Sequence, residues 1–372
     1  MRGRIVLPLV LFLAAASGRA DPLRYDWRLE DGVEYDSTPG RIERIDGIPS
    51  QPVPPGSTLA RVVASGALVA DLGESNGLAL SGAFGGKWFT QSQSRAENVM
   101  VVQAAASDMQ RLWRRTAVAM AFSYYDVFQR RSTELPDFRS LAPSLRLEQG
   151  IADGLVISLG GGYRWFTFKP ERAFSFRAPT AFFSIHHVLP GDLLAGGADW
   201  EWRAGGSLEA RGFDGAACTA SGCEQASGGA RHQDRFWIGH AELSRTGSWL
   251  VGAGLAVHWN QSNSYGESLV RGLVHLRAVV PLPWELSVSM RAEVVATRYG
   301  DPLTFLKPVA GLPSASIEDE SRSTLRVELS RLFAGHVELG ARYVYYTSAP
   351  TSSAIDFRRQ TALFYIAFLD EK

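Results

Sequence analysis

Apolar and polar residues alternate one by one along most of the chain, in one segment after another. In the segment 23–36, one face holds aromatic and aliphatic side chains, namely Tyr25, Trp27, Leu29, Val33 and Tyr35. The other face is charged, with Arg24, Asp26, Arg28, Glu30, Glu34 and Asp36. A period of two residues is typical of β-strands, because successive side chains of a strand point to opposite sides. The pattern predicts long strands with one polar face.

Sixteen segments carry this pattern, and turn-forming residues separate them. In the first half we predict strands at 23–36, 58–72, 78–91, 97–110, 116–128, 138–150, 155–168 and 174–188. In the second half we predict them at 193–211, 234–245, 249–260, 267–280, 285–299, 320–330, 336–347 and 358–369. A count of about 14 strands is the alternative, because strand boundaries are read less well than strand cores.

The connections alternate between short and long, which gives the sheet a direction. The short turns are 74–77, 152–154, 190–192, 246–247 and 281–283, and the long segments are 37–57, 212–233 and 300–319. Transmembrane β-barrels of outer membranes have short periplasmic turns and long extracellular loops. If these strands form such a barrel, both termini are expected in the periplasm.

The hydropathy and the aromatic spacing agree with a membrane barrel. Mean hydropathy is −0.06, as expected when lipid-facing and water-facing residues alternate. Trp249 and Trp259 lie on one face of a predicted strand, about 34 Å apart along it. A tilt of roughly 35–45° reduces this to a height of about 25 Å, the height of the apolar band between aromatic girdles. We therefore expect an all-β fold, a single antiparallel transmembrane β-barrel. The alternative, a soluble sandwich or propeller, would not need strands this long.

The first twenty residues have the order of a secretory signal peptide. Arg2 and Arg4 precede an apolar run at 5–16, and the small-residue ending 18–20 follows. We predict a signal peptide at 1–20 and an outer-membrane barrel domain at 21–372. Without the leader, 35 basic residues stand against 38 acidic ones, so no nucleic-acid partner is indicated. We expect Cys218 and Cys223 to form a disulfide in a surface loop, since an oxidising compartment allows one.

Two short motifs resemble those of porin-like outer-membrane β-barrels of Gram-negative bacteria. The segment 32–37 reads Gly-Val-Glu-Tyr-Asp-Ser, similar to the start of some barrel domains, and 360–368 is similar to an aromatic C-terminal strand. Four residues follow Phe368, whereas many such barrels stop at the aromatic residue. The resemblance implies insertion by the barrel assembly machinery and contact with outer-membrane lipid and lipopolysaccharide.

The polar strand faces hold the residues for which we predict a functional role. A barrel of 16 strands is wide enough for an aqueous channel, whose field its charges would set. The alternative is that these charges pair across strands in a narrow or plugged interior. The predicted pore-lining residues are Arg61, Lys87, Arg164, Glu201, Arg203, Glu209, Arg211, Arg271, His275, Arg277, Arg291, Glu293, Arg326, Glu328 and Arg342.

One stretch suggests catalysis, but only weakly. His258 and Ser262 look superficially similar to the His and Ser of outer-membrane phospholipases, which are two residues apart. Four residues along a strand separate the side chains by about 13 Å, which is too far for a nucleophile and its base to share a hydrogen bond. We therefore expect no enzyme, cofactor or metal site. The main hypothesis is a passive channel for small hydrophilic solutes; the alternatives are a non-conducting surface barrel that uses its long loops and, more remotely, a lipid hydrolase.

Overall fold

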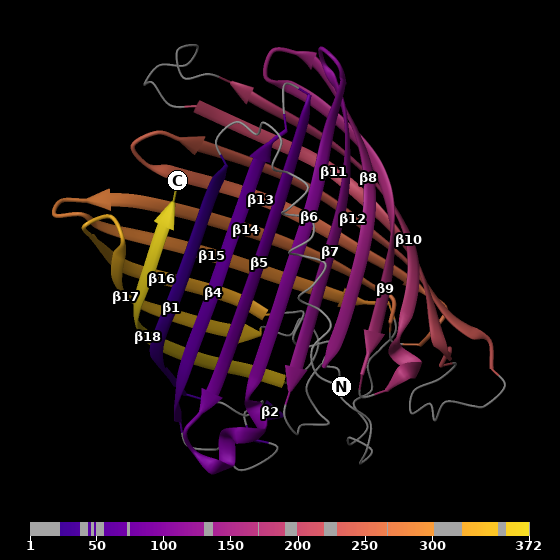
Figure 1. The fold of residues 1–372 in the computed structure, drawn as a ribbon. Coiled ribbons are helices and arrows are strands. Elements are labelled where there is room, and N and C mark those ends of the chain that lie inside the picture. Colours follow the sequence, from indigo (N-terminus) through magenta and orange to yellow (C-terminus); the bar gives the residue numbers. More distant parts are fainter. Residues whose placement is uncertain are drawn as a thin grey trace, which may run out of the picture.

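The computed structural model describes most of the chain beyond the first 22 residues. The described residues are 23–37, 44–45, 48–49, 56–72, 75–129, 137–169, 171–189, 199–218, 229–265, 267–300, 322–348 and 355–371. The predicted signal peptide at 1–20 lies outside them, as do most residues of the predicted long segments 37–57 and 300–319. The residues that are described form one continuous, strongly curved sheet (Figure 1).

Sixteen long strands make up the barrel. In the first half these are β1 (Arg24–Asp36), β4 (Ser57–Asp71), β5 (Asn76–Phe89), β6 (Val99–Trp113), β7 (Thr116–Gln129), β8 (Phe138–Ala152), β9 (Leu155–Phe168) and β10 (Phe176–Leu189). In the second half they are β11 (Asp199–Ala216), β12 (Arg231–Thr246), β13 (Leu250–Ser262), β14 (Leu269–Leu282), β15 (Leu286–Tyr299), β16 (Arg322–Phe333), β17 (Val337–Ser348) and β18 (Ile355–Glu371). The prediction of sixteen strands is confirmed, and most boundaries agree to within three residues.

The barrel closes between its first and last strands. β1 pairs antiparallel with β4 on one side and with β18 on the other, so that Trp27 lies opposite both Gly66 and Asp370. Every other long strand pairs antiparallel with its neighbours in the chain. Closure removes the free strand edges that would otherwise leave backbone groups unpaired in lipid. Two short strands, β2 (Arg44–Ile45) and β3 (Ile48–Pro49), form a hairpin beside β18 within the predicted long segment 37–57.

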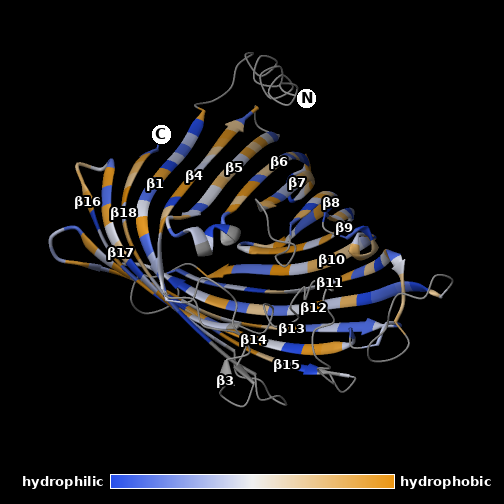
Figure 2. Cartoon of the chain, turned by 90° about the horizontal axis from the view of Figure 1, so that it is seen from below, coloured by the Kyte–Doolittle hydropathy of each residue, from blue (hydrophilic) through white to orange (hydrophobic). Residues whose placement is uncertain are grey.

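The alternation predicted from the sequence separates an apolar exterior from a polar interior, and bands of opposite hydropathy alternate along each strand (Figure 2). On β13, Val251, Leu255 and Val257 are exposed on the outside between Trp249 and Trp259, which are exposed as well. The neighbouring strands continue this surface with Trp237, Leu243, Val270, Val274, Leu276 and Val294. In water such a surface would be unfavourable over so many strands, so it fits a hydrocarbon environment.

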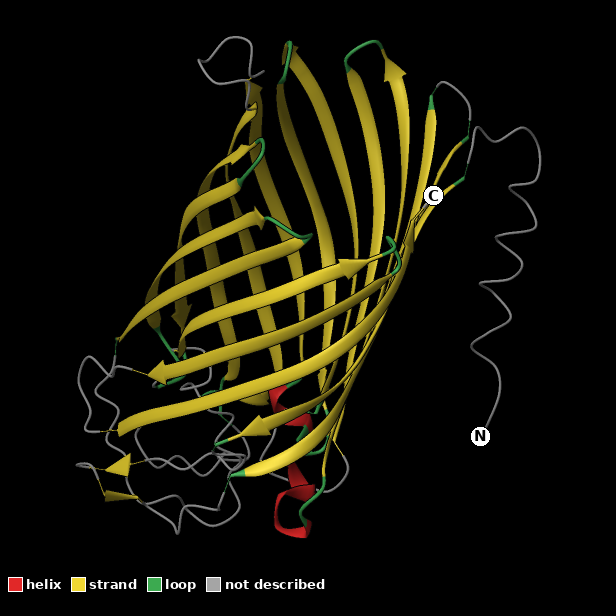
Figure 3. Cartoon of the chain, turned by 90° about the vertical axis from the view of Figure 1, so that its left-hand side faces the viewer, coloured by secondary structure: helices red, strands yellow, loops and turns green. Residues whose placement is uncertain are grey.

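The two ends of the barrel differ in their connections. One end has tight turns at 114–115, 153–154, 247–249, 283–285 and 334–336. The other end carries the longer connections, among them the short helices η1 (Ser92–Glu97) and η2 (Arg172–Phe174), which Figure 3 shows at the same end. The predicted alternation of short and long connections is thus confirmed where the connections are described; the predicted turn 190–192 is not among them. Among the described residues, no helix has the length and apolarity needed to cross a membrane.

Candidate functional site

The interior wall brings together all fifteen residues predicted to line a pore. The strand register places each of them on the face that carries the buried carboxylates of β1, and ion pairs or polar contacts join most of them to neighbours. Their face is therefore settled by the structure. Their role in transport stays a prediction.

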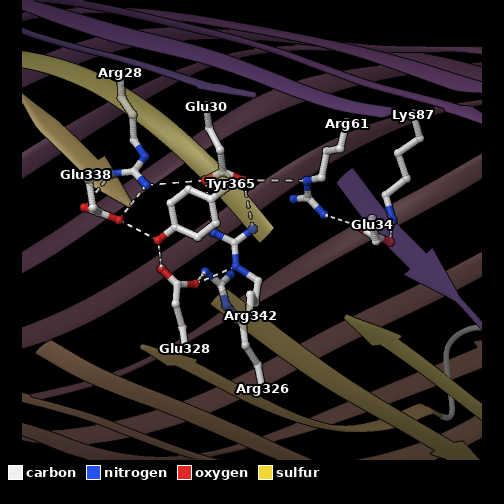
Figure 4. Close-up of polar contacts among 10 residues, drawn as sticks. All are labelled: Arg28, Glu30, Glu34, Arg61, Lys87, Arg326, Glu328, Glu338, Arg342 and Tyr365. Atoms are coloured by element: carbon white, nitrogen blue, oxygen red, sulfur yellow. Dashed lines mark hydrogen bonds and ion pairs between the residues drawn. The ribbon is translucent and has the colours of Figure 1, made fainter. Parts of the chain in front are cut away.

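A network of charged side chains crosses the seam where the barrel closes (Figure 4). Its centre is Arg342 of β17, whose two terminal nitrogens each donate to Glu30 of β1 at 3.0 Å. The Nε of Arg342 donates to Glu328 of β16 at 2.5 Å. Both ends of this guanidinium are thus matched to carboxylates, which is the geometry in which arginine pairs are strongest. Because β1 and β17 are 312 residues apart at this contact, only closure of the barrel creates it.

Tyr365 of β18 lies between the two sides of this network. Its hydroxyl lies 2.8 Å from Glu328 and 2.5 Å from Glu338, and the guanidinium of Arg342 lies 5.0 Å from the centre of its ring. The ring occupies the space in front of Gly340, where an added Cβ would come within 2.3 Å of the ring carbon Cζ. A glycine at this position therefore lets a buried tyrosine lie flat against the wall and reach both carboxylates.

A second group of charges continues the network along β1, β4 and β5. Glu34 is almost fully buried and accepts hydrogen bonds from Arg61 at 3.1 Å and from Lys87 at 2.7 Å. Next to it, Asp36 of β1 is bound by Arg359 of β18. Two cations on one carboxylate compensate the cost of burying its charge. The first strand is thus tied to both of its neighbours by interior ion pairs.

The wall formed by β9 to β14 carries ion pairs whose side chains are more exposed than those of the seam. Glu209 of β11 accepts from Arg164 of β9 at 3.1 Å and from Arg211 at 2.5 Å. Arg277 of β14 binds Glu242 of β12 at 2.8 Å, and its side chain passes over Gly252 of β13, where an added Cβ would lie 2.8 Å from Nε. Charged side chains therefore pair across strands on this wall too.

A cavity of about 420 Å³ lies in the interior beside the network. Apart from Val63, it is lined by charged and hydroxyl-bearing side chains, namely Arg28, Glu30, Arg61, Ser287, Ser289, Arg326, Glu328, Ser330, Glu338 and Arg342. Ser287 and Ser330 share a hydrogen bond of 2.9 Å on the same wall. A cavity of this size and polarity is suited to water or a small polar solute rather than to an apolar ligand.

The stretch considered for catalysis also faces the interior. His258 and Ser262 both lie on β13, so they are separated by an extended strand as expected. Ser262 instead contacts His232 of β12, whose Nε2 lies 3.1 Å from the serine oxygen and 2.8 Å from Asp234. A serine relay needs one imidazole nitrogen for the nucleophile and the other for the carboxylate. Here one nitrogen serves both contacts, which is not the geometry of a relay.

An aromatic row that the sequence did not predict lies near the end with the longer connections. Rings of Tyr125, Phe138, Phe166, Phe176, Phe213 and His232, on six consecutive strands, contact their neighbours in turn. The first four pairs of ring centres are 4.7 to 5.4 Å apart, distances typical of favourable aromatic packing, and the rings of Phe213 and His232 stack face to face at 3.9 Å. The rings cover one another, so they form a small apolar core inside this half of the barrel.

Asp126 is an acidic group that faces outward, although most acids of the strands face inward. Asp126 of β7 shares its face with Met120 and Phe122, yet it is fully buried. Arg139 of β8 binds it at 3.0 Å, and Lys169, which follows β9, binds it at 2.7 Å. Although burial opposes its charge, the hydrogen bonds and ion pairs of Lys169 with Asp126 and Asp137 raise the pKa of its amine. This cluster at the strand ends thus hides a carboxylate from lipid.

The predicted disulfide is described only in part. Cys218 follows β11 and is disulfide-bonded. Cys223, the second cysteine of the chain, lies outside the described residues. The backbone amide of Cys218 also donates to Ser264 at 3.1 Å, which ties this connection to the one after β13.

Comparison with known proteins identifies the fold. No protein-family model and no curated protein matches the sequence. Among solved structures, OprB of Pseudomonas putida aligns with a TM-score of 0.52 at 10% identity, over 93% of this chain and 94% of that one. The chain has the fold of porin-like outer-membrane β-barrels. OccAB1 of Acinetobacter baumannii aligns with a TM-score of 0.48 at 9% identity, over 95% of this chain and 98% of that one. The outer-membrane protein OmpT of Vibrio cholerae aligns with a TM-score of 0.46 at 10% identity, over 95% of this chain and 99% of that one. The exposed apolar exterior fits a barrel of this fold that spans a membrane.

The sequence prediction missed several members of the seam network. Glu30, Glu34 and Arg28 were assigned to the polar face but not named as functional, although the same alternation marks them. Tyr365 gave no signal, because tyrosine reads as apolar and the interior face of β18 carries the apolar Leu363 and Ala367. On the closing strand, polarity therefore does not separate inside from outside.

Proposed function

We propose that this protein is a passive channel for small hydrophilic solutes. The observation that supports it is the water exposure of the interior cations. Arg146, Arg203, Arg277 and Arg291 project from four different strands into the interior, and each side chain is more than two fifths exposed to solvent. Guanidinium groups in a collapsed interior would be buried. Sixteen-stranded barrels are wide enough to hold an aqueous channel.

The orientation follows from the connections. We infer that the end with the tight turns lies in the periplasm, together with the start of β1 and the end of β18, since periplasmic turns of such barrels are short. The exterior would contact outer-membrane lipid and lipopolysaccharide, and the aromatic residues of β18 would present the chain to the barrel assembly machinery. Labelling cysteines introduced at 153 and at 263 in intact cells tests this: only the second should react with an impermeant thiol reagent.

We infer no catalytic role. The serine next to His232 lacks the relay geometry, and both residues face the interior rather than the lipid. The ring of His232 also stacks on Phe213 at 3.9 Å, which fixes the histidine in the aromatic row. A surface-binding barrel would depend on the long segments 37–57, 212–233 and 300–319, and no described contact favours that function over a channel.

The deciding experiment is single-channel recording. Purified, folded protein is inserted into planar lipid bilayers, and the current is followed at fixed voltage. Stable, stepwise increases in ion current are expected. If preparations verified as folded never conduct, the passive channel is excluded.

A further inference from the structure

Three arginines lie directly opposite one another on adjacent strands of the interior wall. Arg277 of β14 pairs with Arg291 of β15, which in turn pairs with Arg326 of β16. Adjacent strands are about 4.8 Å apart, so this arginine row, Arg277–Arg291–Arg326, concentrates positive charge. Like charges directly opposite each other destabilise a sheet. The stability of the fold therefore does not explain the row.

The acidic partners of the arginine row lie deeper in the wall than the arginines do. The side chains of Arg277, Arg291 and Arg326 are 45%, 66% and 42% exposed, whereas those of Glu242, Glu293 and Glu328 are 27%, 29% and 11% exposed. A longer side chain reaches past its partner, so that the cation meets the water first. A solute passing this wall therefore encounters guanidinium groups before carboxylates.

The same order holds elsewhere on the described interior wall. The cation is the more exposed partner in Arg164–Glu209, Arg203–Glu201 and Arg61–Glu34. The same is true of the other described interior pairs of Arg or Lys with an acid, apart from one. The described exception is Arg342–Glu328, where both groups are nearly buried. Although the formal charge of the chain is zero, the charged groups that reach furthest toward the water on this wall are therefore mostly cations.

The three arginines of the row are held with unequal strength. Arg277 is anchored by Glu242 at 2.8 Å and Arg326 by Glu328 at 2.5 Å, but Arg291 lies 3.8 Å from Glu293, at the limit of an ion pair. The central guanidinium thus keeps most of its hydrogen-bonding capacity between two fixed neighbours. Ser287, Ser289 and Ser330 line the adjacent cavity and add hydroxyl donors.

We propose that the interior selects anions, and that the arginine row binds solutes that carry paired oxyanion groups, such as diphosphates or dicarboxylates. The planar fork of a guanidinium matches a carboxylate or phosphate with two hydrogen bonds. Two neighbouring arginines can therefore hold the two groups of one solute. This inference rests on the proposed channel function, and it adds a substrate class and a binding site.

The first test is ion selectivity in planar bilayers under a KCl gradient around 0.1 M, where the Debye length is about 10 Å. Chloride should be more permeant than potassium. A unit charge about 4 Å from a guanidinium in water is favoured about fivefold, so Arg291→Gln should reduce the permeability ratio by up to that factor. The matched control is Arg331→Gln, which removes one positive charge from the outward face of β16 and should leave the ratio unchanged.

The second test is inhibition of the chloride current by inorganic pyrophosphate. Pyrophosphate should reduce the current of the unchanged protein, and Arg291→Gln should raise the concentration for half inhibition about fivefold. A conducting channel that prefers potassium, or whose inhibition Arg291→Gln leaves unchanged, overturns the inference and leaves the channel function standing.

A folded protein that never conducts overturns the channel function instead. Titration calorimetry of pyrophosphate into detergent-folded protein then tests, independently of conduction, whether the arginine row binds this solute. Binding that Arg291→Gln weakens and Arg331→Gln does not supports the site. Absence of binding excludes it.

Discussion

Removal of Glu30 tests whether the interior network holds the barrel closed. Glu30 lies on β1 and accepts two hydrogen bonds of 3.0 Å from Arg342 of β17. The side chains of these two residues are only 6% and 7% exposed. Glu30→Ala deletes the carboxylate and leaves the guanidinium of Arg342 with Glu328 as its remaining acidic partner.

The expected loss of stability follows from the burial of this pair. Removing one partner of a buried ion pair costs about 3–5 kcal/mol, because the other charge stays buried without compensation. Since Arg342 keeps Glu328, and water can enter the vacated space, we expect the lower end, about 3 kcal/mol. Glu30→Gln keeps one acceptor oxygen and should cost roughly half as much. Arg291→Ala breaks an exposed, long pair and should cost less than about 1 kcal/mol.

The assay is urea unfolding of the barrel in lipid vesicles, followed by tryptophan fluorescence and by the faster gel migration of folded, unboiled protein. The three variants should rank Glu30→Ala, Glu30→Gln and Arg291→Ala from most to least destabilised. In the double variant Glu30→Ala with Arg342→Met, the guanidinium that lost Glu30 is removed as well, and part of the stability should return. If Glu30→Ala lies within 1 kcal/mol of the unchanged protein, the interior is too wet for these pairs to act as buried ones.

Three further substitutions test the register and the packing of the wall. Leu255→Arg places a charge on the outward face of β13, between Trp249 and Trp259, and should cost about 2–4 kcal/mol of stability. Ala256→Arg faces the interior and should cost less. Urea unfolding in vesicles compares the two variants, and the reverse ranking would mean that the register is shifted by one residue. Gly340→Ala puts a Cβ within 2.3 Å of the ring of Tyr365, so it should cost about 1–3 kcal/mol in the same assay, and an unchanged unfolding midpoint would contradict this packing.

The sequence by itself determined the strands, their faces and their order. Each of these is a local property: a strand shows its two faces through a period of two residues, and antiparallel neighbours need only short turns. The segment from Leu250 to Ser262 therefore revealed its lipid face without any knowledge of the other strands. The same local pattern placed the charged residues inside, including all three members of the arginine row.

Only the tertiary structure decided which charges meet and which of them face water. Arg342 finds Glu30 because the closed barrel brings β17 next to β18 and β18 next to β1, a contact between residues 312 positions apart. Tyr365 lies over Gly340 because the register sets them opposite each other on neighbouring strands. The sequence counts equal numbers of basic and acidic residues, yet the depth of each side chain depends on neighbours across the sheet. Ion preference depends on which charge projects further into the water, and composition contains no information about that depth.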